Sequence, residues 1–363
     1  MIRWRAGTVS EITRRRRGAA EVDVVTDEGT LAALAYTELV GEPEIGDRVL
    51  LNTTAITLGL GTGGYALIVA IPDRLPADRD EPGHIVKARY TPLQATVCAV
   101  DEQDSPHHQL LRDADDLGGM PVVVADLHSA LVPILAGLRI DGRDARVVYV
   151  MTDGGALPLA FSRSVEQLTE AGWLAATVTV GQAYGGDVEA VTLHTGLLAA
   201  RLVLGADLAI VTQGPGNLGT GTRWGFSGVA SGEAVNAIAA LRGAPVAALR
   251  ISEADPRERH RGVSHHSLTA LGRVALAPAD VVVPQLAGSL GVEVDAAVAQ
   301  LSPPHRLVTV AVDGLTEAVR GAPVQASTMG RGLDEDLAYF LGCAAAGRHA
   351  ASLLQVDGTE VPQ

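Results

Sequence analysis

The sequence predicts an α/β protein whose main part is a mostly parallel, Rossmann-like sheet with helices on both faces, preceded by a small N-terminal β-barrel or sandwich. Three observations predict it. Turn-punctuated apolar stretches fill the first 71 residues, strand-sized apolar runs alternate with helical stretches from about residue 84, and 47% of the chain is hydrophobic although only 3% is aromatic. The chain has 363 residues, enough for about two domains, which we place at residues 1–83 and 84–363.

The first part of the chain is rich in short β patterns. Turn signals such as Asp27-Glu28-Gly29 separate its apolar stretches, and no long helical pattern interrupts them. Five short strands without a long helix are typical of a small barrel or sandwich. The four consecutive arginines at 14–17 are expected to form a solvated hairpin tip. Residues 72–83 are polar, contain three prolines and are expected to form a linker. The expected strands are 6–12, 21–26, 31–37, 47–53 and 65–71.

The second part alternates buried strands with helices. Its apolar runs show no polar alternation, which indicates strands buried on both faces. Strand–helix alternation implies right-handed crossovers and a mostly parallel sheet. Ligands of such sheets bind beyond the carboxyl ends of the strands. The expected strands are 96–99, 121–125, 146–150, 175–179, 208–212, 246–250, 281–284 and 306–310, and the expected helices are 105–118, 129–138, 161–172, 188–204, 231–241, 264–275, 289–301 and 333–354.

Charge and cysteine content exclude several classes of partner. The formal net charge is −14 and the pI is about 5.1, so we expect no nucleic-acid partner, because an acidic surface repels phosphate backbones. The amino terminus lacks the apolar core of a signal peptide, and no apolar run is long enough to span a membrane, so we expect a cytoplasmic protein without a membrane partner. Cys98 and Cys343 are far apart, so neither a disulfide framework nor a cysteine-rich metal site is indicated.

A loop rich in glycine and threonine follows the expected strand 208–212. Glycines let backbone N–H groups approach an anion, and threonine hydroxyls add further donors. No Gly-Lys-Ser/Thr follows, so the loop is not a Walker A motif. The alternative interpretation is a long structural loop with tight turns. The residues expected to bind an anion are Gly214, Gly216, Gly219, Thr220 and Thr222.

The segment 253–266 concentrates histidines, carboxylates and arginines after the expected strand 246–250. His260 is a candidate for acid–base chemistry, and Arg257 and Arg259 are candidates for binding an anion and neutralising developing charge. The alternative interpretation is an arginine-rich loop held by local ion pairs.

The same segment contains candidate metal ligands. Asp255 and His265 are the two that we select for a divalent cation. His265 and His266 are adjacent, so on a helix they diverge by roughly 100° and are not expected to bind one ion together. Ser264 is expected to cap the helix that follows.

Two further strand ends carry candidate acid–base groups. Asp153 follows the expected strand 146–150, and His128 follows 121–125 with Asp126 two residues before it. The alternative interpretation is that each caps a helix. No GxSxG motif is present, so a nucleophile-elbow serine hydrolase is not expected.

Several sequence stretches together resemble a bacterial family known as domain of unknown function 3866. The similarity runs from about residue 1 to 345. The resemblance implies that nearly the whole chain is one unit, and it supplies no catalytic residue, because the family has no established activity. The stretches are WRAGTV (4–9), LNTTAITLGLGTGGY (51–65), MTDGGALPLAFS (151–162), TQGPGNLGTGT (212–222), GFSG (225–228) and ADPRERHRGVSHHSLTALG (254–272).

The function hypothesis from these residues is binding or processing of a small anionic metabolite at the strand-end loops. A non-catalytic ligand sensor and a structural, oligomeric scaffold are the alternatives, and a homo-oligomer is compatible with all three. Convergence of the strand-end groups on one pocket would favour the first hypothesis. The sequence identifies neither a cofactor nor a substrate.

Overall fold

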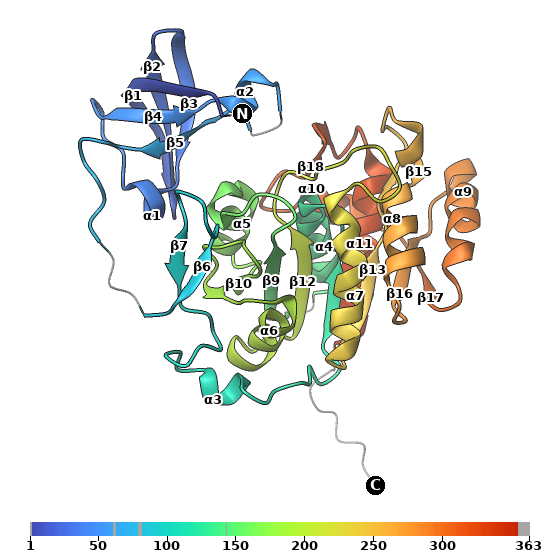
Figure 1. Ribbon diagram of the computed structural model, residues 1–363. Helices are drawn as coiled ribbons and strands as arrows, with labels where there is room; N and C mark the ends of the chain where they lie inside the picture. The colour runs from blue at the N-terminus through green and yellow to red at the C-terminus, as the bar shows by residue number, and fades with distance from the viewer. Residues whose placement is uncertain (1, 61–62, 79–81, 143, 355–363) are drawn as a thin grey trace.

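The computed structural model describes the chain except for residues 1, 61–62, 79–81, 143 and 355–363. A small β unit lies beside a larger α/β unit (Figure 1). Together they confirm the predicted fold class. In the described part of the chain, no helix is both long and apolar enough to cross a membrane.

The N-terminal unit is a closed five-stranded barrel with the strand order β1-β2-β3-β5-β4. Closure leaves no unpaired sheet edge. Inward side chains such as Val22, Val24, Leu51 and Ile68 form a small aliphatic core. The strands are β1 (Trp4–Arg16), β2 (Ala19–Thr26), β3 (Gly29–Ala35), β4 (Arg48–Asn52) and β5 (Ala66–Ala70), and the helices α1 (Thr37–Val40) and α2 (Thr54–Thr57) have four residues each.

The main sheet has eight strands, and every pair of neighbours is parallel. From β8 the chain moves in one direction to β9, β10 and β11, returns to β12 between β9 and β8, and then continues on the other side of β8. The reversal therefore lies at β8 and β12, where α/β sheets open a crevice for ligands. The strands are β8 (Pro121–Val124), β9 (Val147–Thr152), β10 (Ala176–Thr179), β11 (Val188–Glu189), β12 (Leu208–Gln213), β13 (Ala244–Ala248), β16 (Asp280–Pro284) and β17 (Arg306–Val310).

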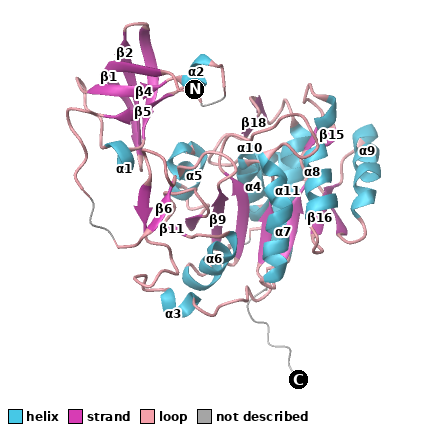
Figure 2. Cartoon of the chain, in the orientation of Figure 1, coloured by secondary structure: helices cyan, strands magenta, loops and turns pink. Residues whose placement is uncertain are grey.

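Helices cover both faces of this sheet (Figure 2). Each face has its own aliphatic cluster, as expected for strands without polar alternation. On one face lie α4 (Leu131–Arg139), α5 (Arg163–Glu170), α10 (Leu315–Arg320) and α11 (Leu337–Ser352), and on the other lie α6 (Leu193–Leu198), α7 (Ala230–Ala240), α8 (His265–Thr269) and α9 (Gly288–Val298).

The segment between the two units differs from its prediction. The stretch expected as sheet strand 96–99 instead contributes β7 (Ala95–Val97) to a separate antiparallel hairpin with β6 (Ile85–Lys87). Of the expected helix 105–118, only α3 (His108–Leu111) is helical. The buried ammonium of Lys87 explains the hairpin's position, because it donates to the carbonyls of Gly181, Ala183 and Ala190 at 2.9–3.1 Å. The hairpin is therefore tied to the loops around β10 and β11.

The arginine run at 14–17 lies at the tip of the β1–β2 hairpin, as predicted, but it is only partly solvated: the Arg15 and Arg17 side chains are 49% and 75% exposed. Arg14 pairs with Glu166 at 3.1 Å, and Arg17 pairs with Asp187 at 2.7 Å. The Arg16 guanidinium donates to the carbonyl of Ala160 and has a side chain only 3% exposed. The β1–β2 hairpin therefore carries these charges against the α/β unit, a long-range contact that local composition does not indicate.

Helices α4 and α11 pack with their backbones in direct contact. A Cβ atom at Gly137 would overlap the carbonyl of Ala344, and one at Gly347 would overlap the carbonyl of Ile134. Both glycines are buried in helix interiors, so their role is close approach and not turn formation.

We expect Gly347→Ala to lower the free energy of unfolding by about 2 kcal/mol, although alanine is normally the better helix former. Gly342→Ala in the same helix is the matched control, because its Cβ position lies 3.3 Å from the nearest atom, the carbonyl oxygen of Leu249. Urea denaturation of both variants measures the difference. Equal losses would contradict the close-packing explanation.

Candidate functional site

The carboxyl ends of four adjacent strands bring polar groups to one edge of the sheet. Asp153 follows β9, Gln213 ends β12, Asp126 follows β8 and Arg250 follows β13, and these strands are neighbours in that order. The Gln213 side-chain amide donates to the backbone carbonyl of Asp126 at 2.6 Å, which joins two of the strand ends. The segments selected from the sequence therefore share one edge, because the strands they follow are parallel.

The segment 253–266 is held by a short hairpin. Strands β14 (Ile251–Ser252) and β15 (Gly262–Val263) pair antiparallel, and a 3₁₀ turn (Glu258–His260) lies between them. Ser264 caps α8, as predicted, and its hydroxyl oxygen accepts from the N–H of His266 at 3.2 Å. The hairpin and the cap together fix His260, His265 and His266 on one short stretch of chain.

The three histidines of this segment converge, and we call them the histidine cluster. One ring nitrogen of each of His260, His265 and His266 lies within 4.8 Å of the others. The expectation that adjacent histidines diverge too far to share an ion does not hold here. Ring nitrogens lie several bonds from the backbone, so at the start of α8 the rings of His265 and His266 approach to a centroid separation of 4.4 Å.

Burial favours the neutral form of His260 and His265. His260 and His266 are 1% and 5% exposed, and the Nε2 atom of His265 is buried without a hydrogen-bond partner. Desolvation first, and nearby positive charge second, lowers the pKa of His260 to about 3 and that of His265 to about 4. A neutral imidazole is the form that binds a metal ion. The ring of Phe226 stacks on His266 at 3.8 Å and closes one side of the cluster.

Polar groups lie behind two of the rings. The Nδ1 atom of His260 lies 2.7 Å from the hydroxyl of Ser264, which leaves its Nε2 atom for a ligand. The Nδ1 atom of His266 lies 3.4 Å from the Arg250 guanidinium and 3.6 Å from the Asp126 carboxylate, whose Oδ2 atom is buried without a hydrogen-bond partner. A carboxylate or hydroxyl behind an imidazole is the usual support of a metal ligand. The three residues could therefore hold a divalent transition metal.

Asp255, the other metal ligand expected from the sequence, is not part of the histidine cluster. Arg257 donates to both of its oxygens at 2.8 Å, and Arg250 and Arg331 each lie 3.5 Å from its Oδ2 atom. The hydrogen bond from Arg257 is the main reason that the pKa of Asp255 lies well below its usual range. Asp255 and Arg257 thus brace the loop, which is the ion-paired alternative considered from the sequence.

The glycine- and threonine-rich loop after β12 (residues 213–222), which we call the glycine loop, faces the segment 253–266 through Arg259. The position of a Cβ atom on Gly221 would lie 3.7 Å from the Arg259 guanidinium. Arg259 is exposed and has no ion-pair partner among the described residues. Thr220 and Thr222 are exposed and bond to each other at 3.0 Å. Of the residues expected to bind an anion, Arg259, Thr220 and Thr222 are thus exposed, whereas Arg257 is already bound to Asp255.

The glycines of this loop have different roles. A Cβ atom at Gly214 would overlap the backbone of Ala156, so Gly214 is needed for packing. Gly216 has a positive φ of 97°, and no atom lies within 4 Å of a Cβ atom placed on Gly216 or Gly219. Among the expected anion binders of the loop, Gly216, Gly219, Thr220 and Thr222 are exposed to solvent.

His128 and Asp153 do not join His260. The ring of His128 is buried between the hydroxyls of Tyr149, at 2.9 Å, and Ser162, at 2.7 Å. The Asp153 carboxylate accepts from the N–H of Gln182 at 2.9 Å. The three candidate acid–base groups thus have separate sets of partners, and only His260 belongs to the histidine cluster.

The fold and the histidine cluster define an α/β protein with a candidate metal centre at the carboxyl edge of its sheet. The model of a family described as "Protein of unknown function (DUF3866)" matches residues 32–347, so the chain belongs to that family. This match confirms the resemblance inferred from the sequence. No curated protein and no solved structure matches the chain.

The buried ring of His128 predicts a pH-dependent stability. Desolvation lowers the pKa of His128 from 6.5 to about 4 in the folded chain, so below pH 6.5 the unfolded chain takes up a proton that the folded chain refuses. Stability should fall from pH 7 to pH 5 by about 2 kcal/mol through this residue. His128→Gln should show a shallower fall in urea denaturation at the two pH values, whatever its stability at pH 7. An unchanged slope would contradict the assignment.

Proposed function

We propose that this protein is a metal-dependent enzyme that processes a small anionic metabolite at the carboxyl edge of its sheet. The observation that carries the proposal is the histidine cluster, in which three imidazoles each bring a ring nitrogen within 4.8 Å of the others and the buried Nε2 atom of His265 has no hydrogen-bond partner among the described residues. A buried polar atom without a partner is costly, and a bound cation would satisfy it.

The donor set favours a zinc-like ion. Imidazole suits zinc, copper, iron and nickel, whereas calcium and magnesium prefer oxygen ligands. Three protein ligands leave one position of a tetrahedral ion open for water or substrate, which is the arrangement of catalytic zinc sites. A metal in such a site supplies Lewis acidity and a water of lowered pKa.

Positive charge next to the cluster favours an anionic substrate. Arg259 contributes to the low pKa of His265 and has no carboxylate partner in the described part of the chain. Its guanidinium faces Gly221 of the glycine loop. An anionic group bound by this arginine would lie close to the metal. The proposal includes anion binding and a cytoplasmic location, which are both expected from the sequence.

Metal binding is tested by the metal content of the purified protein after incubation with Zn²⁺ or Co²⁺ and removal of the excess. We expect about one ion per chain. His265→Gln should reduce the metal content by at least about ten-fold, because it removes one of the three histidine ligands. His265 suits this test better than the fully buried His260, whose loss would leave a cavity. His194→Gln is the control, since His194 is exposed on α6. Equal metal content in wild type and His265→Gln would overturn the proposal.

Anion processing is tested separately. Wild-type protein, with and without Zn²⁺, is screened for hydrolysis of phosphate esters and carboxylate esters. Arg259→Ala should raise KM about ten-fold, with a smaller effect on metal content. A protein that binds metal but turns over no substrate, with or without Arg259, would favour the non-catalytic sensor.

A further inference from the structure

A second site lies between the barrel and the α/β unit, and we propose that it binds a small organic cation with an apolar body. The cavity has a volume of about 330 Å³, which is sufficient for a small metabolite. None of the residues that line it belongs to the histidine cluster. The proposal is thus independent of the proposed function.

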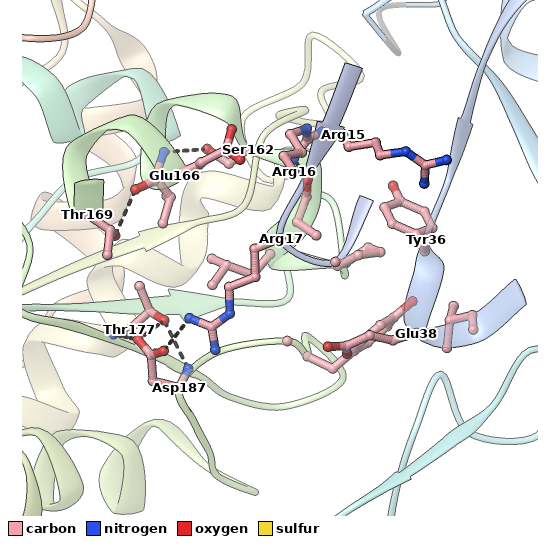
Figure 3. A pocket seen from close by; sticks show the side chains of 18 of the residues that line it. Arg15, Arg16, Arg17, Tyr36, Glu38, Ser162, Glu166, Thr169, Thr177 and Asp187 are labelled. Carbon is pink, nitrogen blue, oxygen red and sulfur yellow. Dashed lines mark hydrogen bonds and ion pairs between the residues drawn. The ribbon is translucent and has the colours of Figure 1, made fainter. Parts of the chain in front are cut away.

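Ion pairs join the barrel to the α/β unit around the cavity. Arg14 and Arg17 of the β1–β2 hairpin pair with Glu166 and Asp187 of the α/β unit. Arg163 of α5 pairs with Glu21 of β2 on another side. Because charged contacts join the two units here, apolar packing does not fill the space between them. Figure 3 shows Arg17 and Tyr36 on the barrel side, opposite Thr177 and Asp187.

The walls of the cavity are amphipathic. Leu39, Pro158, Leu159, Ala160 and Val165 line it with apolar surface. Apolar walls with a few polar groups are typical of sites for small organic molecules, and such sites often lie at domain interfaces.

Two tyrosines from opposite walls have unused hydroxyl groups. Tyr36 comes from the barrel and Tyr184 from the loop after β10, and neither hydroxyl has a hydrogen-bond partner among the described residues. Burial is the main reason that the pKa of each lies above its usual value, so both remain neutral phenols. The charge of Glu38 adds to this effect on Tyr184, and both residues line the cavity.

The charged side chains that line the cavity are negative in sum. Three arginines line it together with four carboxylates, those of Glu38, Glu166, Glu170 and Asp187. Arg15 pairs with Glu42 at 2.6 Å and Arg17 with Asp187 at 2.7 Å, whereas Arg16 lies 3.4 Å from Glu21, a carboxylate that it shares with Arg163.

By contrast, Glu38 and Glu170 line the cavity and have no ion-pair partner in the described part of the chain. Since the carboxylates that line the cavity outnumber its guanidinium groups, the cavity disfavours an anion. An ammonium group would find a carboxylate at Glu38 and two electron-rich rings at Tyr36 and Tyr184.

Calorimetric titration of the full chain with matched ligands tests the charge preference. Phenethylamine, butylamine and benzyltrimethylammonium are each compared with the alcohol and the carboxylate of the same body. We expect at least one ammonium compound to bind about ten-fold more tightly than its alcohol and its carboxylate. Tighter binding of a carboxylate, or no ammonium compound bound above its alcohol, would overturn the proposal.

Variants then locate the site. Glu38→Gln should weaken the best ammonium ligand about ten-fold and leave its alcohol analogue unchanged. Tyr36→Phe should weaken it less, because the ring remains. Glu11→Gln is the matched control, since Glu11 is exposed on β1 of the barrel and does not line the cavity. Equal weakening by Glu38→Gln and Glu11→Gln would place the binding elsewhere. Circular dichroism and thermal unfolding confirm that each variant is folded.

Discussion

A buried guanidinium organises the carboxyl edge of the sheet. The Arg250 side chain is 3% exposed and lies among Asp126, Asp255 and His266, at 3.8, 3.5 and 3.4 Å. A buried charge is very costly unless carboxylates surround it, so Arg250 constrains where both carboxylates can lie. The loop that carries Asp255 and the strand end that carries Asp126 are thereby fixed relative to β13. The position of the histidine cluster depends on that arrangement.

The fold could be predicted because its signals are local. Continuous apolar runs indicated buried parallel strands, and parallel strands necessarily bring 126, 153, 213 and 250 to the same edge. The cap at Ser264 was also visible, because capping depends on neighbouring residues. The details of the site depended on partners distant in sequence. Nothing near His266 indicates that Asp126 lies behind it, 140 positions earlier in the chain (266 − 126).

What the sequence does not indicate has one physical origin. The ion pairs around Asp255 have no local signal, because Arg331, one of its partners, is 76 residues away. The ion pairs of Arg14 and Arg17 have no local signal either, because Glu166 and Asp187 belong to another unit of the fold. Sequence patterns identify which residues carry charge. They do not identify which charges neutralise one another across the structure.

The burial of Lys87 in the β6–β7 hairpin leaves the surface of the protein without a lysine amine. Lys87 is the only lysine in the sequence; it is fully buried, and Glu189 lies 3.3 Å from its ammonium group. Burial lowers its pKa, but its three carbonyl partners shield it from reagents. Amine-directed modification of the folded chain therefore has no exposed lysine to attack, and lysine crosslinkers would report nothing about its neighbours. Acylation of Lys87 requires the β6–β7 hairpin to detach from the loops around β10 and β11. The rate of acylation at this side chain therefore measures local unfolding of the hairpin.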